Sequence, residues 1–251
     1  MNRTKETHDE IEKSFHDSLA GKIVSSPEKV DTWETENWNF ILDNIGDLKN
    51  KRILDVGCGF GRDSILFAKN GAIVTGIDIS DKSIELAQKS AINHNVNVNF
   101  KVLKVEDLDY EHHFDVIYCK GSLHHFYDVE KVISILYNCL KEGGLLIAQE
   151  PKAENPIAVI GRMFFNPSTS TERPFKTGEL NHLFTKVFGN CNAKYFNLFS
   201  PICFTFAKIR FLNSGFLRNI VFNLIAPIDR VLLKYNFFKK YSWIEVVWSY
   251  K

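Results

Sequence analysis

The stretch Ile53-Leu54-Asp55-Val56-Gly57-Cys58-Gly59-Phe60-Gly61 decides the fold of this chain. A buried parallel strand reads as a short, continuous apolar run, and the first four residues fit that description. Glycines follow at alternate positions, where the absence of a Cβ allows positive φ and lets a ligand approach the backbone. The residues from Arg62 to Asn70 have helix-forming composition and end before Gly71. The stretch therefore predicts a strand, a glycine loop and a helix.

A second apolar strand with an acidic end follows, from Val74 to Ile79. Asp78 stands at its carboxyl end, where a carboxylate can accept both hydroxyl hydrogens of a ribose. The two strands together predict a site for a nucleoside. An ordinary αβ turn followed by an acidic strand end is the alternative.

Glycine spacing separates two kinds of nucleotide site. The dinucleotide fingerprint places glycine at the first, third and sixth positions. Here Gly57, Gly59 and Gly61 take the first, third and fifth, and Arg62 stands at the sixth. Asp55, inside the motif, suits an ammonium group, which methionine has and NAD lacks. The motif therefore favours S-adenosylmethionine as the cofactor.

Four segments together resemble the class I S-adenosylmethionine-dependent methyltransferases, in particular the small-molecule branch of methyltransferase types 11 and 25. They are the glycine motif, Asp78, Phe114-Asp115-Val116-Ile117 and Leu140-Lys141-Glu142-Gly143-Gly144, and the match runs from about Trp38 to Pro151. The resemblance implies an α/β fold with a Rossmann-like, doubly wound sheet of seven strands. We expect the sheet to be mostly parallel, with an antiparallel last strand and a helical insertion between the last two strands.

The resemblance also implies cofactor contacts, position by position. Asp55 would reach the methionine amino group, and the loop of Gly57, Cys58, Gly59 and Gly61 would pass under the methionyl moiety. The ribose hydroxyls would be held by Asp78, and the adenine would pack on Ile79. The remaining predicted contacts are Val105, Glu106, Asp107 and Cys119.

One departure from the family concerns the adenine edge. Relatives commonly carry an aspartate two residues before the Glu-Asp-Leu segment, and this chain has Lys104 there. Either Glu106 or Asp107 then takes the exocyclic amine, or that contact is missing.

Alternating strand and helix patterns predict one parallel, doubly wound domain over residues 1–251. We divide it into an N-terminal helical cap (1–46), a cofactor-binding core (47–151), a connection with a helix and a strand (152–201), a hydrophobic and basic helical lid (202–242) and a last strand (243–251). Helices are expected near 4–20, 32–46, 62–70, 81–94, 129–141 and 178–189. Strands are expected at 52–56, 73–78, 98–103, 114–119, 144–149, 192–199 and 243–250.

Composition narrows the class of protein. The chain has 31 basic and 30 acidic residues among 251, which argues against a general nucleic-acid binder. Its five cysteines are odd in number and lack metal-ligand spacing, so we expect reduced thiols, no metal and a cytoplasmic protein. We find no secretory signal and no apolar run of membrane-spanning length.

The segment between the last two strands is far longer than a hairpin needs. Positions 217, 220, 221, 224, 225 and 228 form an apolar helical stripe, which Pro227 is expected to kink or end. Residues 201–244 carry seven bases and a single acid, Asp229. Three interpretations are open. The segment packs on the domain or on a second subunit in a homodimer, forms an acceptor pocket for a phosphorylated or lipid-linked substrate, or lies in the plane of a membrane and makes the protein peripheral to it.

Methyl transfer from a sulfonium needs an aligned acceptor, exclusion of water and removal of a proton where the acceptor has one. In a doubly wound sheet, ligands gather outside the carboxyl ends of the strands. The candidate bases there are His124, His125 and Glu150, since an imidazole titrates near neutrality. For the histidines the alternative is a structural hydrogen bond from loop to sheet. For Glu150 it is binding of acceptor hydroxyls.

The residues after the fourth strand also bear on the substrate. Enzymes that methylate amines of nucleic-acid bases carry an Asn-Pro-Pro-aromatic segment there, and this chain has Cys119-Lys120-Gly121-Ser122. We predict methyl transfer to a small molecule, at the oxygen of a sugar, lipid-linked or secondary-metabolite hydroxyl, with S-adenosylhomocysteine as product. The alternatives are a nitrogen or carbon acceptor, or a non-catalytic adenosine-fold protein that uses residues 202–240 to bind a partner or membrane.

Overall fold

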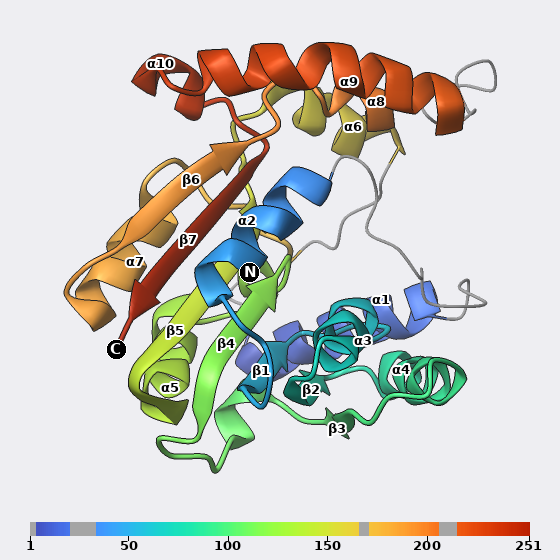
Figure 1. The fold of residues 1–251 in the computed structure, drawn as a ribbon, viewed down its shortest axis with the longest axis vertical. Coiled ribbons are helices and arrows are strands. Elements are labelled where there is room, and N and C mark those ends of the chain that lie inside the picture. The colour runs from blue at the N-terminus through green and yellow to red at the C-terminus, as the bar shows by residue number, and fades with distance from the viewer. Residues whose placement is uncertain (1–3, 21–33, 166–170, 206–214) are drawn as a thin grey trace.

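A computed structural model describes residues 4–20, 34–165, 171–205 and 215–251 (Figure 1). Its helices are α1 (Lys5–Ala20), α2 (Thr35–Ile45), α3 (Arg62–Lys69), α4 (Asp81–Asn93), α5 (Val129–Cys139), α6 (Pro156–Phe165), α7 (Glu179–Phe188), α8 (Ile202–Thr205), α9 (Gly215–Leu232) and α10 (Asn236–Lys239), with 3-10 turns η1 (Val105–Asp107) and η2 (Leu123–His125). Its strands are β1 (Arg52–Val56), β2 (Ile73–Asp78), β3 (Asn99–Val102), β4 (Phe114–Lys120), β5 (Leu140–Pro151), β6 (Asn192–Phe196) and β7 (Ile244–Tyr250).

The strands form one seven-stranded sheet in the order β3-β2-β1-β4-β5-β7-β6. Neighbours among β1 to β5 pair in parallel, whereas β7 runs antiparallel to both β5 and β6. The winding reverses between β1 and β4, and a crevice opens at such a switch point outside the carboxyl ends of the strands. The predicted fold class is confirmed, including the antiparallel last strand.

Buried clusters fix the helices against the two faces of the sheet. On one face, α5 and α7 contribute Leu136 and Phe184 to a cluster that reaches Val247 of β7. On the other, Ile41 of α2 and Phe67 of α3 pack on strand residues of β1, β4 and β7. Burying one such side chain is worth about 1.5–3 kcal/mol. The two clusters therefore hold the carboxyl ends of β1 and β4 in a fixed relation.

The strand before the insertion is shorter than predicted. β6 ends at Phe196, whereas the sequence predicts a strand to residue 199. Asn197 has a positive φ of 61°, which turns the chain out of the sheet. The backbone N–H groups of residues 198–200 then donate to the Asp229 carboxylate of α9 at 2.9–3.1 Å, in place of a neighbouring strand.

Helix α9 continues through Pro227 to Leu232, so of the two predicted effects of this proline, a kink or an end, the end is wrong. Asn223 and Pro227 both lie on the exposed side of α9. Water can reach the carbonyl that the proline leaves without a helix donor, which lowers the cost of the missing bond. Figure 1 shows α9 across the ends of β6 and β7, next to α6 and α8. No helix in the described ranges is long and apolar enough to cross a bilayer.

Candidate cofactor cleft and active site

Two cavities meet at the carboxyl edge of the sheet, and Gly57 and Gly121 line both of them. The first lies between α1, the end of β2 and η1. The second, of about 400 Å³, lies between the glycine loop, the start of α3 and the end of β4. Gly57 follows β1 and Gly121 follows β4, so the cavities join at the switch point of the sheet.

The first cavity has the chemistry of a nucleoside site. Its lining includes four of the predicted cofactor contacts, Asp78, Ile79, Val105 and Glu106. The backbone N–H of Gly59 and that of Ser80 each donate to the Asp78 carboxylate at 2.9 Å, which fixes this group at the rim of the cavity. Asp107 was predicted to line the cleft as well, but it is exposed and lines neither cavity.

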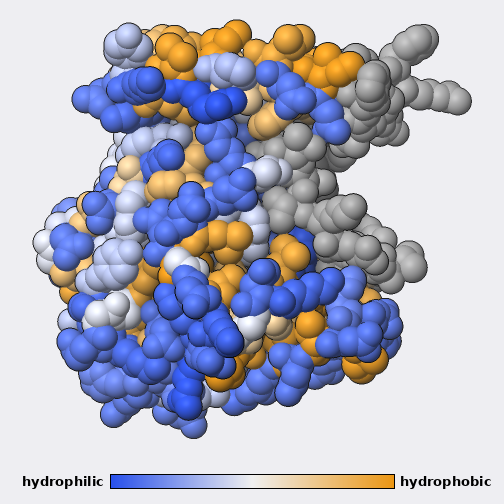
Figure 2. Space-filling view, viewed as in Figure 1, coloured by the Kyte–Doolittle hydropathy of each residue, from blue (hydrophilic) through white to orange (hydrophobic). Residues whose placement is uncertain are grey.

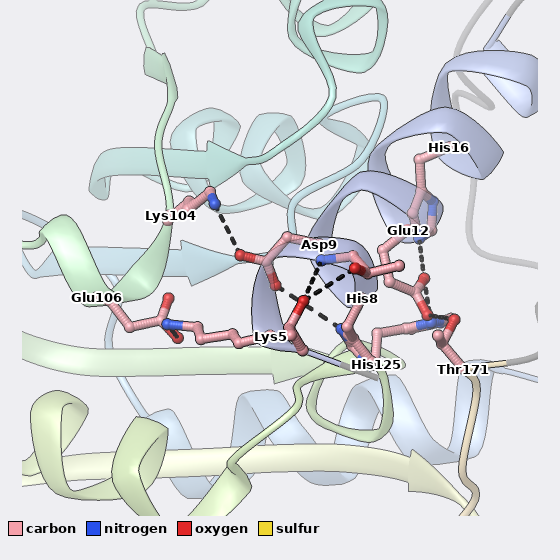
Figure 3. A network of polar contacts seen from close by, with 11 residues as sticks. Lys5, His8, Asp9, Glu12, His16, Lys104, Glu106, His125 and Thr171 are labelled. Atoms are coloured by element: carbon pink, nitrogen blue, oxygen red, sulfur yellow. Dashed lines mark hydrogen bonds and ion pairs between the residues drawn. The ribbon is translucent and has the colours of Figure 1, made fainter. Parts of the chain in front are cut away.

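Helix α1 covers the first cavity and is held there by ion pairs (Figure 3). Lys5 pairs with Glu106 at 2.6 Å, and Lys104 pairs with Asp9 at 2.7 Å. The hydroxyl of Ser80 also donates to Asp17 at 2.6 Å. Lys104, the departure from the family pattern, therefore anchors the covering helix.

The second cavity is lined by charged groups that are buried or half-buried. Arg62 pairs with Glu34 at 2.7 Å and with Asp63 at 2.8 Å. Lys120 pairs with the same two carboxylates, at 3.0 Å and 3.2 Å. Burial alone would raise the pKa of Asp63, but Lys120 and Arg62 hold it below its usual value. Asp55 joins these four in the lining. The cavity therefore offers both cationic and anionic side chains, which can pair with the carboxylate and the ammonium group of a zwitterionic ligand.

Asp55 is buried at the floor of this cavity and accepts a hydrogen bond from the Ser64 hydroxyl at 2.6 Å. Burial and the nearby Asp63 carboxylate raise the pKa of Asp55 to about 7. A cation placed beside it would favour the ionised carboxylate. The residue is therefore suited to the ammonium group that the sequence assigns to it.

The glycine loop leaves room for a ligand. A Cβ built on Gly59 would meet no atom within 4 Å, so the space above this residue is open. A Cβ on Gly57 would lie 2.6 Å from the Cβ of Ser122, so only glycine lets the two loops approach. With the charged groups nearby, this space fits the methionyl part of S-adenosylmethionine.

Glu150 holds the loop after β4. Its Oε1 accepts from the backbone N–H groups of Ser122 and Leu123 at 3.0 Å and 2.8 Å, and its Oε2 lies 2.6 Å from His124 Nδ1. Burial opposes charging of His124, but Glu150 and Glu172 outweigh it and raise the pKa of His124 to about 9. His124 is thus an imidazolium at neutral pH and cannot accept a further proton.

The prediction that His124 and Glu150 are candidate bases needs correction. Neither side chain lines either cavity, and each is bonded to the other. The loop-to-sheet bond, weighed as an alternative from the sequence, is the arrangement found. Cys119 likewise packs in the core beneath the loop and lines neither cavity, whereas Cys58 lines the second.

His125 faces the first cavity and meets α1 there (Figure 3). Its Nδ1 lies 2.9 Å from Glu12 Oε2, and Thr171 donates to the other oxygen of that carboxylate. The His16 ring stands edge-on to the His125 ring, with centroids 5.1 Å apart. Burial and the neighbouring His125 lower the pKa of His16. A carboxylate-supported histidine therefore stands beside the nucleoside cavity.

The same three residues could hold a metal ion. Glu12, His16 and His125 each bring one ligand atom within 4.8 Å of the others. Two imidazoles and a carboxylate are ligands that first-row divalent metals accept. The sequence predicts no metal, because its cysteines lack metal-ligand spacing, and the placement of Glu12, His16 and His125 is not visible in that spacing.

Several lining residues were missed from the sequence as site residues: Glu12, His16, Glu34, Arg62 and Asp63. A signal existed for two pairs of them. Glu12 and His16 are four residues apart and share one helix face. Arg62 and Asp63 open the helix after the glycine loop, where side chains face a bound ligand. No pattern marks Glu34, which reaches the cavity only through the placement of α2.

Comparison with known proteins agrees with this geometry. A family model described as a methyltransferase domain matches residues 47–188, and the chain belongs to this family. S-adenosylmethionine is the cofactor of the family, and the lining residues fit it. The match covers the glycine loop, Asp78 and the loop after β4, whereas α1 and Glu34, which also line the cavities, lie outside it.

One curated relative is the ubiquinone biosynthesis O-methyltransferase of Coxiella burnetii (strain Dugway 5J108-111). It is 40% identical over 100 residues, which cover 39% of this chain and 43% of that protein. The chain thus matches less than half the length of this relative.

Two solved structures share the fold. One is the 1,6-didemethyltoxoflavin-N1-methyltransferase of Burkholderia thailandensis, with a TM-score of 0.62, 17% identity and coverage of 100% of this chain and 92% of that one. The other is the magnesium protoporphyrin IX methyltransferase of Synechocystis PCC 6803, with a TM-score of 0.56, 19% identity and coverage of 74% and 93%. Both hold S-adenosylhomocysteine.

Proposed function

We propose that this chain transfers a methyl group from S-adenosylmethionine to a hydroxyl of a small molecule, with His125 as the general base. The observation that carries the proposal is the contact of His125 with the Glu12 carboxylate beside the nucleoside cavity. A hydroxyl acceptor loses a proton as it is methylated, and a base positioned by a carboxylate serves that need. The name of the Coxiella burnetii relative also supports an oxygen acceptor.

The cofactor supplies an electrophilic methyl group when bound, and the protein has three further tasks. Asp55 and the paired charges of Arg62 and Lys120 orient the methionyl end. His125 takes the hydroxyl proton, and Glu12 holds its ring and stabilises the imidazolium that forms. Helix α1 covers the cavity and excludes water.

Glu150 and His124 act as positioning residues in this proposal. Their buried ion pair and the two backbone bonds to Glu150 fix η2 and hence the direction of the next side chain, His125. A misplaced base loses efficiency steeply with distance. The pair therefore supports the transfer without touching the acceptor.

The acceptor site is proposed at the junction of the cavities, near His125 and Phe126. The described residues of the insertion, 202–205 and 215–242, line neither cavity, so they give no support to a lid that forms the acceptor pocket. A sugar, lipid-linked or secondary-metabolite hydroxyl fits this proposal. A nitrogen or carbon acceptor is the alternative, and it would need the base less.

The test measures methyl transfer from S-adenosylmethionine to a panel of phenols and sugars, with chelator present to exclude bound metal. We expect His125→Ala to lower kcat by about 10²–10⁴-fold and leave S-adenosylhomocysteine affinity unchanged. Glu12→Gln should lower kcat by a smaller factor, because it removes only the support of the base.

His182→Ala is the control, since His182 is exposed on α7 and lines neither cavity. Full turnover by His125→Ala would refute the base. Activity that chelator abolishes and a divalent cation restores would favour a metal at Glu12, His16 and His125 instead.

A further inference from the structure

Helix α9 leaves one apolar side uncovered. Ile220, Leu224, Ile228 and Val231 follow one another at helical spacing and are 41%, 68%, 53% and 55% exposed. Residues four and three apart lie on the same face, so these four form a continuous stripe along the helix. Figure 2 shows hydrophobic side chains along the edge of the molecule where Figure 1 places α9. We call these four residues the α9 stripe.

The α9 stripe is extended by neighbouring elements. Tyr235, which precedes α10, and Phe237, within α10, are 62% and 69% exposed. Large apolar patches of this kind are rare on proteins that contact only water. We therefore expect the α9 stripe to be covered by an apolar partner or layer.

The opposite side of α9 is held firmly to the domain. Phe222 and Ala226 are buried against Cys203 of α8. Asp229, on the same side, accepts three backbone N–H bonds from residues 198–200. The Nζ of Lys152 donates to the carbonyl oxygens of Lys239 and Lys240 at 2.6 Å and 3.0 Å, which fixes α10. The stripe is thus mounted rigidly, facing outward.

The charge around the α9 stripe distinguishes between two possible partners, a second copy of this chain and an anionic lipid surface. The bases with described side chains in this part of the chain are Arg230, Lys234, Lys239 and Lys240, and the nearby acid Asp229 is buried. Exposed bases include Arg230, Lys234 and Lys240. A second copy docked through the same face would bring two clusters of bases together, which disfavours association. An anionic lipid surface attracts the bases and offers an apolar layer to the stripe.

We propose that α9 and α10 form a membrane-docking surface that lies in the plane of an anionic bilayer. The α9 stripe, Tyr235 and Phe237 enter the boundary between headgroups and acyl chains. The exposed bases stay at the level of the phosphates. Docking involves no residue that lines the two cavities, so it does not depend on the proposed methyl transfer or on the base.

Vesicle cosedimentation of the full chain, without cofactor, tests the proposal. Vesicles of phosphatidylglycerol and phosphatidylcholine should bind the protein at low salt, and binding should weaken at high salt. Pure phosphatidylcholine vesicles should bind it at least about fivefold less, because they lack the anionic headgroups. Absence of sedimentation with the anionic vesicles would overturn the proposal.

Two matched variants make the test specific. Leu224→Asp should lower the fraction bound to anionic vesicles at least about tenfold, because a charge replaces an inserted side chain. Ile92→Asp on α4, where the native side chain is 73% exposed, should bind like the native protein. Equal loss in both variants would overturn the proposal. Unchanged S-adenosylhomocysteine binding shows that each variant is folded.

Light scattering without lipid separates a membrane from a second copy. We expect a monomer at micromolar concentration for the native protein and for Leu224→Asp. A dimer that Leu224→Asp dissociates would mean that another copy of this chain covers the stripe, and the proposal would fail. Replacing Lys234 and Lys240 by glutamate should reduce binding to anionic vesicles and leave the weak binding to neutral vesicles unchanged.

Discussion

At the scale of single residues, Asp55 is the group whose charge we expect the cofactor to change. In the free cleft, burial and Asp63 raise its pKa to about 7, so that roughly half of the molecules carry a protonated Asp55 at neutral pH. An ammonium group beside it favours the carboxylate form. Binding therefore releases a proton, and affinity should rise with pH until Asp55 is fully ionised in the free protein.

We accordingly expect S-adenosylhomocysteine to bind about fivefold to tenfold more weakly at pH 6.0 than at pH 7.5. Its ammonium group stays charged over this range, so the change reports on the protein. Isothermal titration calorimetry at the two pH values measures it. Asp55→Asn should bind more weakly at both and lose most of the pH dependence. An equal dependence in the two proteins would contradict the assignment.

At the scale of elements, the hydrogen bonds between β5 and the loop at η2 determine the position of His125. Glu150 on the strand accepts them and holds the turn that carries this histidine. The pKa of His124 is about 9 in the folded protein, above its ordinary value of 6.5. A raised pKa means that the folded state holds the proton more tightly. The stability that this contributes is fully present below about pH 6.5 and is lost as pH rises through 9.

The expected loss for the native protein is about 3 kcal/mol in the free energy of unfolding between pH 6.5 and pH 9.5, as an upper value for one group. Urea unfolding at the two pH values measures it. Glu150→Gln should be less stable at pH 6.5 by about 3–5 kcal/mol, because it leaves His124 without its closest carboxylate. It should also lose less stability as pH rises. Parallel pH curves for the two proteins would rule out this role.

At the scale of the whole molecule, the cleft is assembled from parts of the chain that lie far apart. The first cavity joins α1 to η1 and η2, and the second joins Glu34 to the glycine loop and the end of β4. A ligand that fills both cavities ties the covering helix to the core. Charge is divided as well: residues 201–244 carry a net +6, seven bases less one acid, and since the chain carries +1, the rest carries −5. In the described part of this segment, the exposed Lys234 and Lys240 would orient the molecule on an anionic surface.

Ligand binding should therefore raise the stability of the whole domain. At 100 times its Kd, S-adenosylhomocysteine should add about 2.7 kcal/mol, which corresponds to a rise in Tm of about 5–10 °C for a domain of this size. Differential scanning calorimetry checks this. NAD at the same concentration should leave Tm unchanged. Absence of a shift with S-adenosylhomocysteine would favour the non-catalytic alternative.

The sequence by itself determined the fold class and the nucleoside half of the site. The glycine spacing, the acidic end of β2 and the alternation of elements are local patterns, and local patterns set the order of strands and helices. Asp55, Gly57, Gly59, Asp78 and Ile79, which these patterns single out, line the two cavities.

Tertiary structure alone decided the rest of the site. His124 and His125 are neighbours in sequence, yet one turns to Glu150 in the core and the other to Glu12 in the cavity. Only packing decides which side of the chain a side chain takes, and Glu12 is more than a hundred residues from His125. The apolar stripe of α9 follows the same rule: its spacing is visible in the sequence, but its outward direction depends on Phe222, Ala226 and Asp229, which hold the other side of the helix to the domain.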